Sequence, residues 1–367
     1  MSPTFPCGAS QPGIPVPGAG CRVLQSWLPG GRRTPGGIRA RLGRPSMIVV
    51  TGATGFLGCH LVRRLLGAGE VVRCFRRPAS VGATWLTTQP VEVAVGHLHD
   101  PGAVANAFRG AEAVIHLAAP IREVRDAAVE EFHRKTTAAL IHGARDAGLR
   151  RFLMVSPIGS AASSGLPFLR SRGEAEERLR ESGLPFVILQ PSLMFGAGDR
   201  LVDGIMRFLR RTGLLVIPGT GKTMLQPVWV GDVVSCLVRA LRSQVVVDQT
   251  IPIGGPQHLS YEEIADQVGK MLNLPRVKLH VSRRAVGWAS RLLESFGRNP
   301  FPGYRHLELL DVGTITALDS VKRAFRFQPM PLVEGVAYHL ASHGNPGLPW
   351  LSFGADREIR LRSRHRV

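Results

Sequence analysis

The feature that most constrains the fold of this chain is a glycine-rich turn that joins an apolar run to a helical pattern. Residues 47–51 are apolar and mostly β-branched, residues 51–58 read TGATGFLG, and residues 57–66 have helical periodicity. Glycine recurs at every third residue of the turn. A strand, a glycine turn and a helix in this order indicate the first unit of a parallel α/β sheet.

Each glycine of the turn has a physical role in such a unit. Gly52 permits the tight turn, Gly55 lets the backbone approach a phosphate group without a Cβ in the way, and Gly58 lets the helix pack closely against the strand. The free N–H groups and the partial positive charge at the helix N-terminus then attract the phosphates. The turn therefore predicts a binding site for a dinucleotide.

Strand-like and helix-like patterns alternate from this turn to about residue 191. The expected strands are apolar runs and do not alternate with polar residues, as in a sheet that is buried on both faces. This spacing predicts an α/β protein with a Rossmann-type, doubly wound parallel sheet. The expected elements are strands at 47–51, 71–75, 91–95, 113–118, 152–155 and 186–189 and helices at 57–66, 103–108, 127–147 and 174–181.

The rhythm changes after residue 191, which predicts a smaller C-terminal cap region on the substrate side of a cleft. We expect helices at 201–211, 232–242 and 260–272, strands at 226–230 and 250–253, and only helix and loop from there to about residue 340. The helix at 260–272 opens with a capping box, Ser260 and Glu263. The expected division is an NAD(P)-binding domain at 47–200 that is completed by about 225–255, a substrate or cap region at 201–224 and 256–345, and a basic tail at 346–367.

Residues 1–46 differ in composition from the rest of the chain. They are rich in proline and glycine, contain no acidic residue and have no helical or strand period, so we expect them to be disordered. An organelle-targeting segment, a functional tail and a start-site artefact with the true start at Met47 are the three explanations. We favour the last, because proline and glycine at this density oppose the amphipathic helix of a targeting segment.

Composition excludes several classes of protein. The net charge is +19, but the arginines are spread along the chain and gather in no stripe, which argues against nucleic-acid binding and favours an anionic lipid or a phosphorylated ligand. The five cysteines form no CxxC pair, so we expect neither a disulfide scaffold nor a metal site. A hydrophobic fraction of 44% suffices for a real core.

The residues after the second predicted strand bear on which dinucleotide binds. In this fold an acidic residue there holds the ribose 2′-OH of NAD, whereas a basic residue accommodates the 2′-phosphate of NADP. The chain has Arg76 and Arg77 at this place and no acid. A guanidinium forms strong, charge-assisted contacts with phosphate. The sequence therefore favours NADP(H), and NAD(H) stays open as the alternative.

Several motifs together resemble the atypical, extended type of short-chain dehydrogenase/reductase. They are TGxxGxxG, HLAA at 116–119, QPSLMFG at 190–196, PVWVGDV at 227–233 and IGGP at 253–256, so the resemblance covers about residues 47–340. FLRSRGEAE at 168–176 is similar to YLRSKGEAE of the NDUFA9-like branch, named after a subunit of respiratory complex I. The cofactor-binding residues that the resemblance implies are Gly52, Thr54, Gly55, Phe56, Leu57, Gly58, Arg76, Arg77, His97, Leu98, Leu117, Ala118, Ala119, Arg172 and Pro191.

The departure from the family pattern concerns proton transfer. Catalytic members use a YxxxK pair, in which the tyrosine transfers the proton and the lysine holds the ribose and lowers the tyrosine pKa. Here the two positions are Phe168 and Arg172, and phenylalanine has no hydroxyl to donate. The resemblance thus implies an NAD(P)(H)-binding protein with impaired or no classical catalysis. The alternative is an NAD(P)H-dependent oxidoreductase or epimerase with another donor, for which Ser156, Ser160 and His133 are the candidates.

The resemblance also implies association with a respiratory complex or a membrane surface. The expected location is the cytoplasm, or the periphery of the inner membrane, on the matrix side if the source is a eukaryote. Residues 282–296 have an amphipathic pattern that suits either a helix packed on the core or a basic helix on anionic lipid. We further expect Cys59 and His116 to be buried, Asp232 to cap the helix that it opens, and Trp229 to line the cleft or pack in the core.

Overall fold

The computed structural model describes most of the chain between Met47 and His343. The predictions for residues 1–46, for the tail at 346–367 and for most of the amphipathic stretch at 282–296 lie outside the described residues. The structure describes residues 47–78, 83–119, 126–199, 201–274, 276–282, 284–286, 288 and 312–343.

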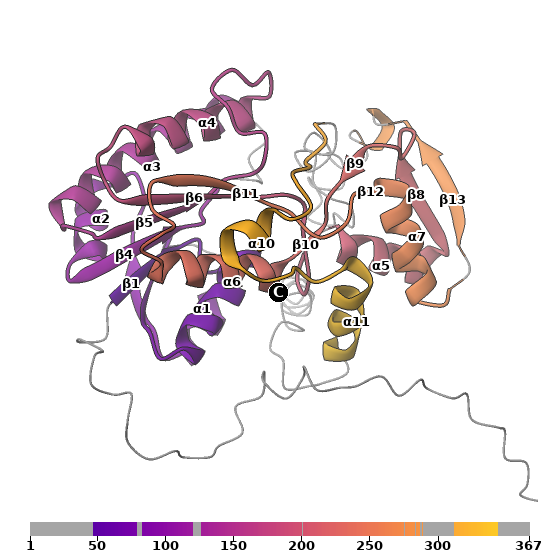
Figure 1. The fold of residues 1–367 in the computed structure, drawn as a ribbon, viewed down its shortest axis with the longest axis horizontal. Coiled ribbons are helices and arrows are strands. Elements are labelled where there is room, and N and C mark those ends of the chain that lie inside the picture. Colours follow the sequence, from indigo (N-terminus) through magenta and orange to yellow (C-terminus); the bar gives the residue numbers. More distant parts are fainter. Residues whose placement is uncertain are drawn as a thin grey trace, which may run out of the picture. The chain divides into compact units, whose positions relative to one another are not determined.

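A seven-stranded parallel sheet forms the centre of the larger lobe (Figure 1). Its strand order is β11-β6-β5-β4-β1-β2-β3, and every neighbouring pair is parallel. The order reverses between β1 and β4, which is the topology of a doubly wound sheet. The predicted fold class is therefore confirmed. The strands are β1 Met47–Thr51, β2 Val71–Arg76, β3 Glu92–Val95, β4 Ala111–His116, β5 Arg151–Val155, β6 Phe186–Pro191 and β11 Gln249–Ile253.

Helices cover both faces of this sheet, which explains the apolar runs in its strands. On β1, Ile48 and Val50 join a core with α1, α6 and α10, whereas Val49 joins a core with α2, α3 and α4. Successive side chains of a strand point to opposite faces, and at β1 both faces are buried. The helices are α1 Phe56–Gly67, α2 Pro101–Phe108, α3 Asp126–Asp146, α4 Pro167–Arg180, α6 Val230–Arg242 and α10 Ser320–Phe325, and a 3-10 helix, η3, spans Ala83–Thr88.

The smaller lobe contains two strands that the sequence analysis missed. β8 (Leu214–Pro218) and β13 (Val277–Val281) pair in parallel, although residues after 260 were expected to be only helix and loop. The two strands are far apart in the chain, so no hairpin signal announces them. The lobe also contains the helices α5 Val202–Thr212, α7 Tyr261–Met271 and α11 Leu332–His343. Two short strand pairs complete it: β7 Met194–Phe195 with β10 Val228–Trp229, and β9 Met224–Leu225 with β12 Leu259–Ser260.

Two predictions about helix starts had different outcomes. The capping box of α7 is present, because the Ser260 side chain accepts from Glu263 N and the Glu263 side chain accepts from Ser260 N. The prediction that Asp232 caps α6 is wrong. The N-cap is Trp229, and the Asp232 carboxylate accepts from the backbone N–H of Met330 at 2.7 Å. Asp232 therefore ties the C-terminal segment to the large lobe.

A pair of acidic residues at the start of α5, Asp199 buried and Asp203 half-buried, makes a second tie to the C-terminal segment. Asp199 accepts from the N–H groups of Gly196 and Val202 at 3.0 and 2.7 Å. Asp203, one turn further on, lies 2.5 Å from the imidazole of His339 on α11. Burial, with the charge of Asp203 as a second cause, raises the pKa of Asp199 to about 7.

Within the described residues, no helix is long and apolar enough to cross a membrane.

Candidate functional site

The glycine turn lies at the carboxyl end of β1, next to the chain that leaves β4. Gly52 has φ +75°, and a Cβ there would lie 2.8 Å from Ala118 N. A Cβ on Gly58 would lie 2.2 Å from Gly52 O, so this glycine lets α1 pack on the turn itself, where the sequence analysis expected contact with the strand. On Gly55 a Cβ would meet only Gly52 O, at 3.2 Å. The side of the turn at Gly55 is thus open to a ligand.

The N-terminus of α1 presents its backbone N–H groups to the same open side. Gly55 is the N-cap, and no side chain among the described residues caps it. The first turn of α1 contains no acidic residue. Thr54 and Phe56 are half-buried and Leu57 is buried. The arrangement suits an anion, because helix N-terminal N–H groups and the helix dipole both favour negative charge.

Of the two basic residues, Arg76 ends β2 and Arg77 follows it, beside the turn. Arg76 pairs with Val95 of β3, and its Nη1 donates to the carbonyl oxygens of Arg77 and Pro78 at 3.3 and 3.1 Å. Arg77 is exposed. Because β1 and β2 are parallel neighbours, both guanidinium groups start from the edge of the sheet at which the glycine turn lies.

The segments after β3 and β4 complete this edge. The rings of His97 and His99 are 5.3 Å apart and exposed, whereas the Leu98 side chain between them is buried in the core. Leu117 N donates to Thr51 O at 3.1 Å, which holds the chain leaving β4 against β1. Ala118 and Ala119 follow as half-buried residues, and Pro191, which ends β6, is buried.

His116 and Cys59 are buried, as predicted. The Nδ1 of His116 lies 2.8 Å from Thr51 Oγ1, and the imidazole is completely buried. Burial lowers the pKa of His116 to about 3, and the charge of Arg172 lowers it further. Cys59 is on the buried side of α1 and packs in the core. Trp229 is half-buried, with its ring centroid 5.5 Å from that of Tyr338 on α11.

Phe168 and Arg172 lie one turn apart on α4. Phe168 is buried against Val129, and its ring centroid is 5.7 Å from that of His133. Arg172 is only 2% exposed, and its Nη2 donates to Val155 O at the end of β5. Burial lowers the pKa of Arg172 to about 10. Its Nε and Nη1 have no hydrogen-bond partner among the described residues.

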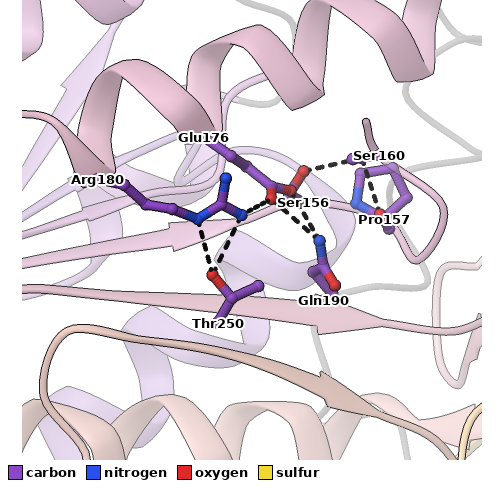
Figure 2. Close-up of polar contacts among 7 residues, drawn as sticks. All are labelled: Ser156, Pro157, Ser160, Glu176, Arg180, Gln190 and Thr250. Carbon is purple, nitrogen blue, oxygen red and sulfur yellow. Dashed lines mark hydrogen bonds and ion pairs between the residues drawn. The ribbon is translucent and has the colours of Figure 1, made fainter. Parts of the chain in front are cut away.

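The hydroxyl groups near these residues already donate their protons to protein oxygens. Ser156 Oγ donates to Ser160 Oγ at 3.0 Å, and Ser160 Oγ donates to Pro157 O at 2.8 Å (Figure 2). His133 Nδ1 lies 2.8 Å from Ser171 Oγ, which itself donates to Phe168 O at 3.1 Å. The serine hydroxyl has one proton, so Nδ1 of His133 is the donor in that contact.

A charged network that the sequence analysis missed lies beside Arg172. Glu176 is 1% exposed, and its carboxylate accepts from Gln190 Nε2 at 3.0 Å and from Arg180 Nη2 at 2.6 Å (Figure 2). Arg180 also contacts Thr250 Oγ1 on β11 at 3.2 Å. Glu176 raises the pKa of Arg172 and so offsets part of the effect of burial. The i, i+4 spacing of 172, 176 and 180 is the signal that could have revealed this ladder.

These features fit a phosphorylated dinucleotide. An open glycine turn and an uncapped helix N-terminus suit its phosphates, and two buried guanidinium donors without partners suit hydroxyl groups. In the described residues no cluster of three or more histidine, cysteine or acidic side chains is placed to hold a metal ion. The fold and the site thus define the class of Rossmann proteins that bind a dinucleotide.

Comparison with known proteins identifies the family within this class. A family model described as NAD(P)H-binding matches residues 52–199. The chain is 30% identical over 225 residues to an NAD(P)H azoreductase of Xenophilus azovorans, which covers 60% of this chain and 71% of that protein. The chain therefore belongs to the NAD(P)H-binding family, and the resemblance to the extended short-chain dehydrogenase/reductases is confirmed.

Two further comparisons cover more of the chain. It is 28% identical over 314 residues, 83% of this chain and 76% of the other, to NADH dehydrogenase [ubiquinone] 1 alpha subcomplex subunit 9, mitochondrial, of Arabidopsis thaliana. The structure of a UDP-glucose 4-epimerase from Thermotoga maritima matches with a TM-score of 0.65 and 19% identity over 80% of this chain and 97% of that one. At that identity the likeness concerns the fold alone.

Proposed function

We propose that this chain binds NAD(P)(H) and lacks the proton transfer of classical short-chain dehydrogenases. The observation that carries the proposal is the buried Phe168 one turn before Arg172 on α4. A phenylalanine ring has no proton to donate. General acid–base help contributes roughly 10²–10⁴ in rate, so its loss leaves hydride transfer slow even with the nucleotide in place.

Different residues of the chain would bind the phosphates and the ribose hydroxyls of the nucleotide. The turn at Gly52 and Gly55 and the N-terminus of α1 bind the phosphates. Arg172 stays protonated at neutral pH, because its lowered pKa is still about 10, and its Nε and Nη1 are donors for ribose hydroxyls. The bound nicotinamide supplies hydride-transfer chemistry.

No described tyrosine replaces the missing phenol. Tyr261 is buried in the core of the smaller lobe, where burial raises its pKa far above the ordinary value. Tyr338 packs against Trp229. Among the described residues, Arg172 is therefore left without a phenol whose pKa it would lower.

NADP(H) is the nucleotide that we propose, with NAD(H) as the alternative. Arg76 ends β2 and Arg77 follows it, at the place that the ribose 2′-position occupies in this fold, and no acidic residue stands there. A guanidinium favours a 2′-phosphate by charge and by paired hydrogen bonds.

Restoring the YxxxK pair tests the proposal. The double variant Phe168→Tyr, Arg172→Lys should oxidise NADPH slowly in the presence of a quinone, an aldehyde or an azo dye, whereas the parent should not. Phe168→Met with Arg172→Lys is the matched control, since it changes the same two positions without adding a hydroxyl. Isothermal titration with NADPH confirms that each variant still binds. Brisk turnover by the parent would refute the proposal.

An active NAD(P)H-dependent oxidoreductase or epimerase with another donor is the second candidate. The half-buried Ser160, hydrogen-bonded to Ser156 at 3.0 Å, is the observation that favours it, with His133 beside Phe168 as a further donor. One relative is named an NAD(P)H azoreductase, which supports an active oxidoreductase as the second candidate. If the parent turns over, Ser160→Ala, Ser156→Ala and His133→Asn identify the donor by which change lowers kcat while the affinity for NADPH is kept.

We also propose the domain division stated above, with a nucleotide domain at 47–200 completed by 225–255 and a cap at 201–224 and 256–345. The separate core of the smaller lobe supports it, except that α10, which lies within 256–345, packs in the core of the large lobe. Association with a respiratory complex or a membrane surface, peripheral to the inner membrane, is proposed from the likeness to NADH dehydrogenase subunits. Co-migration with the complex on a native gel tests the first partner, and migration of the chain alone in source-cell extract would contradict it.

A further inference from the structure

The C-terminal segment of the described chain joins the cores of both lobes. Phe325 of α10 packs in the core of the large lobe, whereas Val336 of α11 packs in the core of the smaller lobe. Between the two helices, Met330 N donates to the Asp232 carboxylate at 2.7 Å. The position of α11 is therefore fixed from the large lobe as well as from the smaller one.

The chain between β7 and α5 forms a tight turn that two acidic side chains hold. We call residues 196–199 the bridging turn. Gly196 N donates to Asp199 Oδ2 at 3.0 Å, and Gly198 N donates to Asp203 Oδ2 at 3.1 Å. The two glycines have φ +143° and +88°, a region that other residues rarely adopt. The conformation of the bridging turn therefore depends on backbone N–H groups that these carboxylates bind.

α11 contacts the bridging turn through His339. The imidazole is 2% exposed, and its Nε2 lies 2.5 Å from Asp203 Oδ1, while the other oxygen of this carboxylate binds Gly198 N. A carboxylate oxygen only accepts, so the imidazole is the donor. One turn earlier on α11, Gly335 packs against Phe195, since a Cβ at this glycine would lie 2.6 Å from the ring. Phe195 immediately precedes the bridging turn, so α11 contacts the chain before and after it.

The other side of the bridging turn contacts the start of α1, where we place the phosphates. Ala197 O lies 3.0 Å from His60 Nε2. Burial lowers the pKa of His60 to about 4, so the ring is neutral at pH 7, and the contact with a carbonyl oxygen places its one N–H on Nε2. A Cβ on Gly198 would lie 3.9 Å from the ring of Phe56, the first residue of α1. The bridging turn thus lies against the helix whose N–H groups would bind the nucleotide.

We propose that His339 is a positioning residue for the nucleotide site, because it holds the bridging turn against the start of α1 through Asp203. Without this hydrogen bond the half-buried Asp203 carboxylate would turn toward water and release Gly198 N. The bridging turn would then leave Phe56, and the N-terminus of α1 would lose the support that orders its N–H groups for a phosphate. The inference rests on the proposed binding of the nucleotide at α1 and adds a residue of the C-terminal helix that acts from outside the site.

Nucleotide affinity and amide exchange of the full-length protein test the proposal. His339→Phe keeps an aromatic ring and removes the donor, and it should raise the Kd for NADPH about tenfold. In nucleotide-free protein the same variant should speed hydrogen exchange of the bridging turn roughly tenfold. His339→Gln restores a side-chain N–H donor, so it should bring both quantities close to those of the parent.

Two further variants separate this contact from a general loss of stability. Asp203→Leu removes the acceptor, and adding His339→Phe to it should change the Kd no further, because His339 acts through that carboxylate. Val336→Ala, also on α11, leaves a cavity in the core of the smaller lobe and keeps the His339 contact. It should lower the Tm without changing the Kd for NADPH or the exchange of the bridging turn.

The proposal is wrong if His339→Phe binds NADPH as tightly as the parent, or if its bridging turn exchanges at the parent's rate. It is also wrong if His339→Gln or Val336→Ala loses as much affinity as His339→Phe. A parent that binds neither NADPH nor NADH refutes the proposed function and with it the positioning role, while amide exchange shows separately whether His339 holds the bridging turn. A His339→Phe protein that does not fold is replaced by His339→Leu, which also lacks a donor and has the same expected results.

Discussion

Gly55→Val should abolish nucleotide binding while leaving the fold intact. Gly55 has φ −81° and ψ 174°, an extended conformation that valine adopts without strain. Its Cβ would meet only Gly52 O, at 3.2 Å. The cost to stability is that of replacing glycine at an N-cap, about 1 kcal/mol or less, together with a shift of a few tenths of an ångström at Gly52 O. The valine side chain would stand on the open side of the turn, where we place the phosphates.

The expected loss of affinity is large, because the backbone N–H groups no longer reach the phosphate oxygens. We expect the Kd for NADPH to rise roughly 100-fold or more, which is about 2.7 kcal/mol. Isothermal titration measures it, and thermal denaturation without ligand measures the fold. Gly67→Ala, at the end of α1 with nothing within 4 Å of the new Cβ, is the control for glycine replacement on this helix.

Gly52→Ala should behave in the opposite way. At φ +75° an L-residue costs about 1–2 kcal/mol, and its Cβ would lie 2.8 Å from Ala118 N, which cannot yield easily because it is backbone. This variant should lower the Tm before any ligand is added.

A Gly55→Val protein that binds NADPH as tightly as the parent would refute our placement of the phosphates at this turn.

Three further predictions concern other parts of the molecule. Arg76→Glu should weaken NADPH far more than NADH in paired titrations, and equal losses would contradict the NADP(H) assignment. Burial and the charge of Asp203 raise the pKa of Asp199 from 3.8 to about 7, so the folded state holds a proton that the unfolded state has released. The free energy of unfolding, measured with urea, should therefore fall as pH rises from about 4 to about 7, and this slope should be shallower in Asp199→Asn. A chain that begins at Met47, where β1 starts, should keep the parent's Tm and NADPH affinity, and a drop of several degrees would show that residues 1–46 contribute.

Prediction from the sequence succeeded where the signal is local. The strand, turn and helix at 47–67 are neighbours in the chain, so their glycine spacing and apolar period carry the information. The capping box of α7 is equally local, because Ser260 and Glu263 stand three residues apart. The candidate site stays a prediction, although the carboxyl ends of β1, β2 and β4 lie on one edge of the sheet, as parallel pairing requires.

Prediction failed where a residue's partner is distant in the chain. Asp232 looked like a helix cap, but its carboxylate binds the backbone of Met330, and only the folded chain brings the two together. β8 and β13 pair across some sixty residues, with Leu214 opposite Val277, and no turn chemistry links them.

The sequence by itself determined the class of this protein, because short apolar runs and a glycine turn indicate a Rossmann sheet, and both are local signals. It also determined that residue 168 has no hydroxyl. The tertiary structure alone decided that Arg172 and Glu176 are buried, and that the apolar side chains of β13 point to one face while Lys278 points to the other. Burial and strand register arise from contacts among distant segments, and composition and spacing do not encode which distant segments meet.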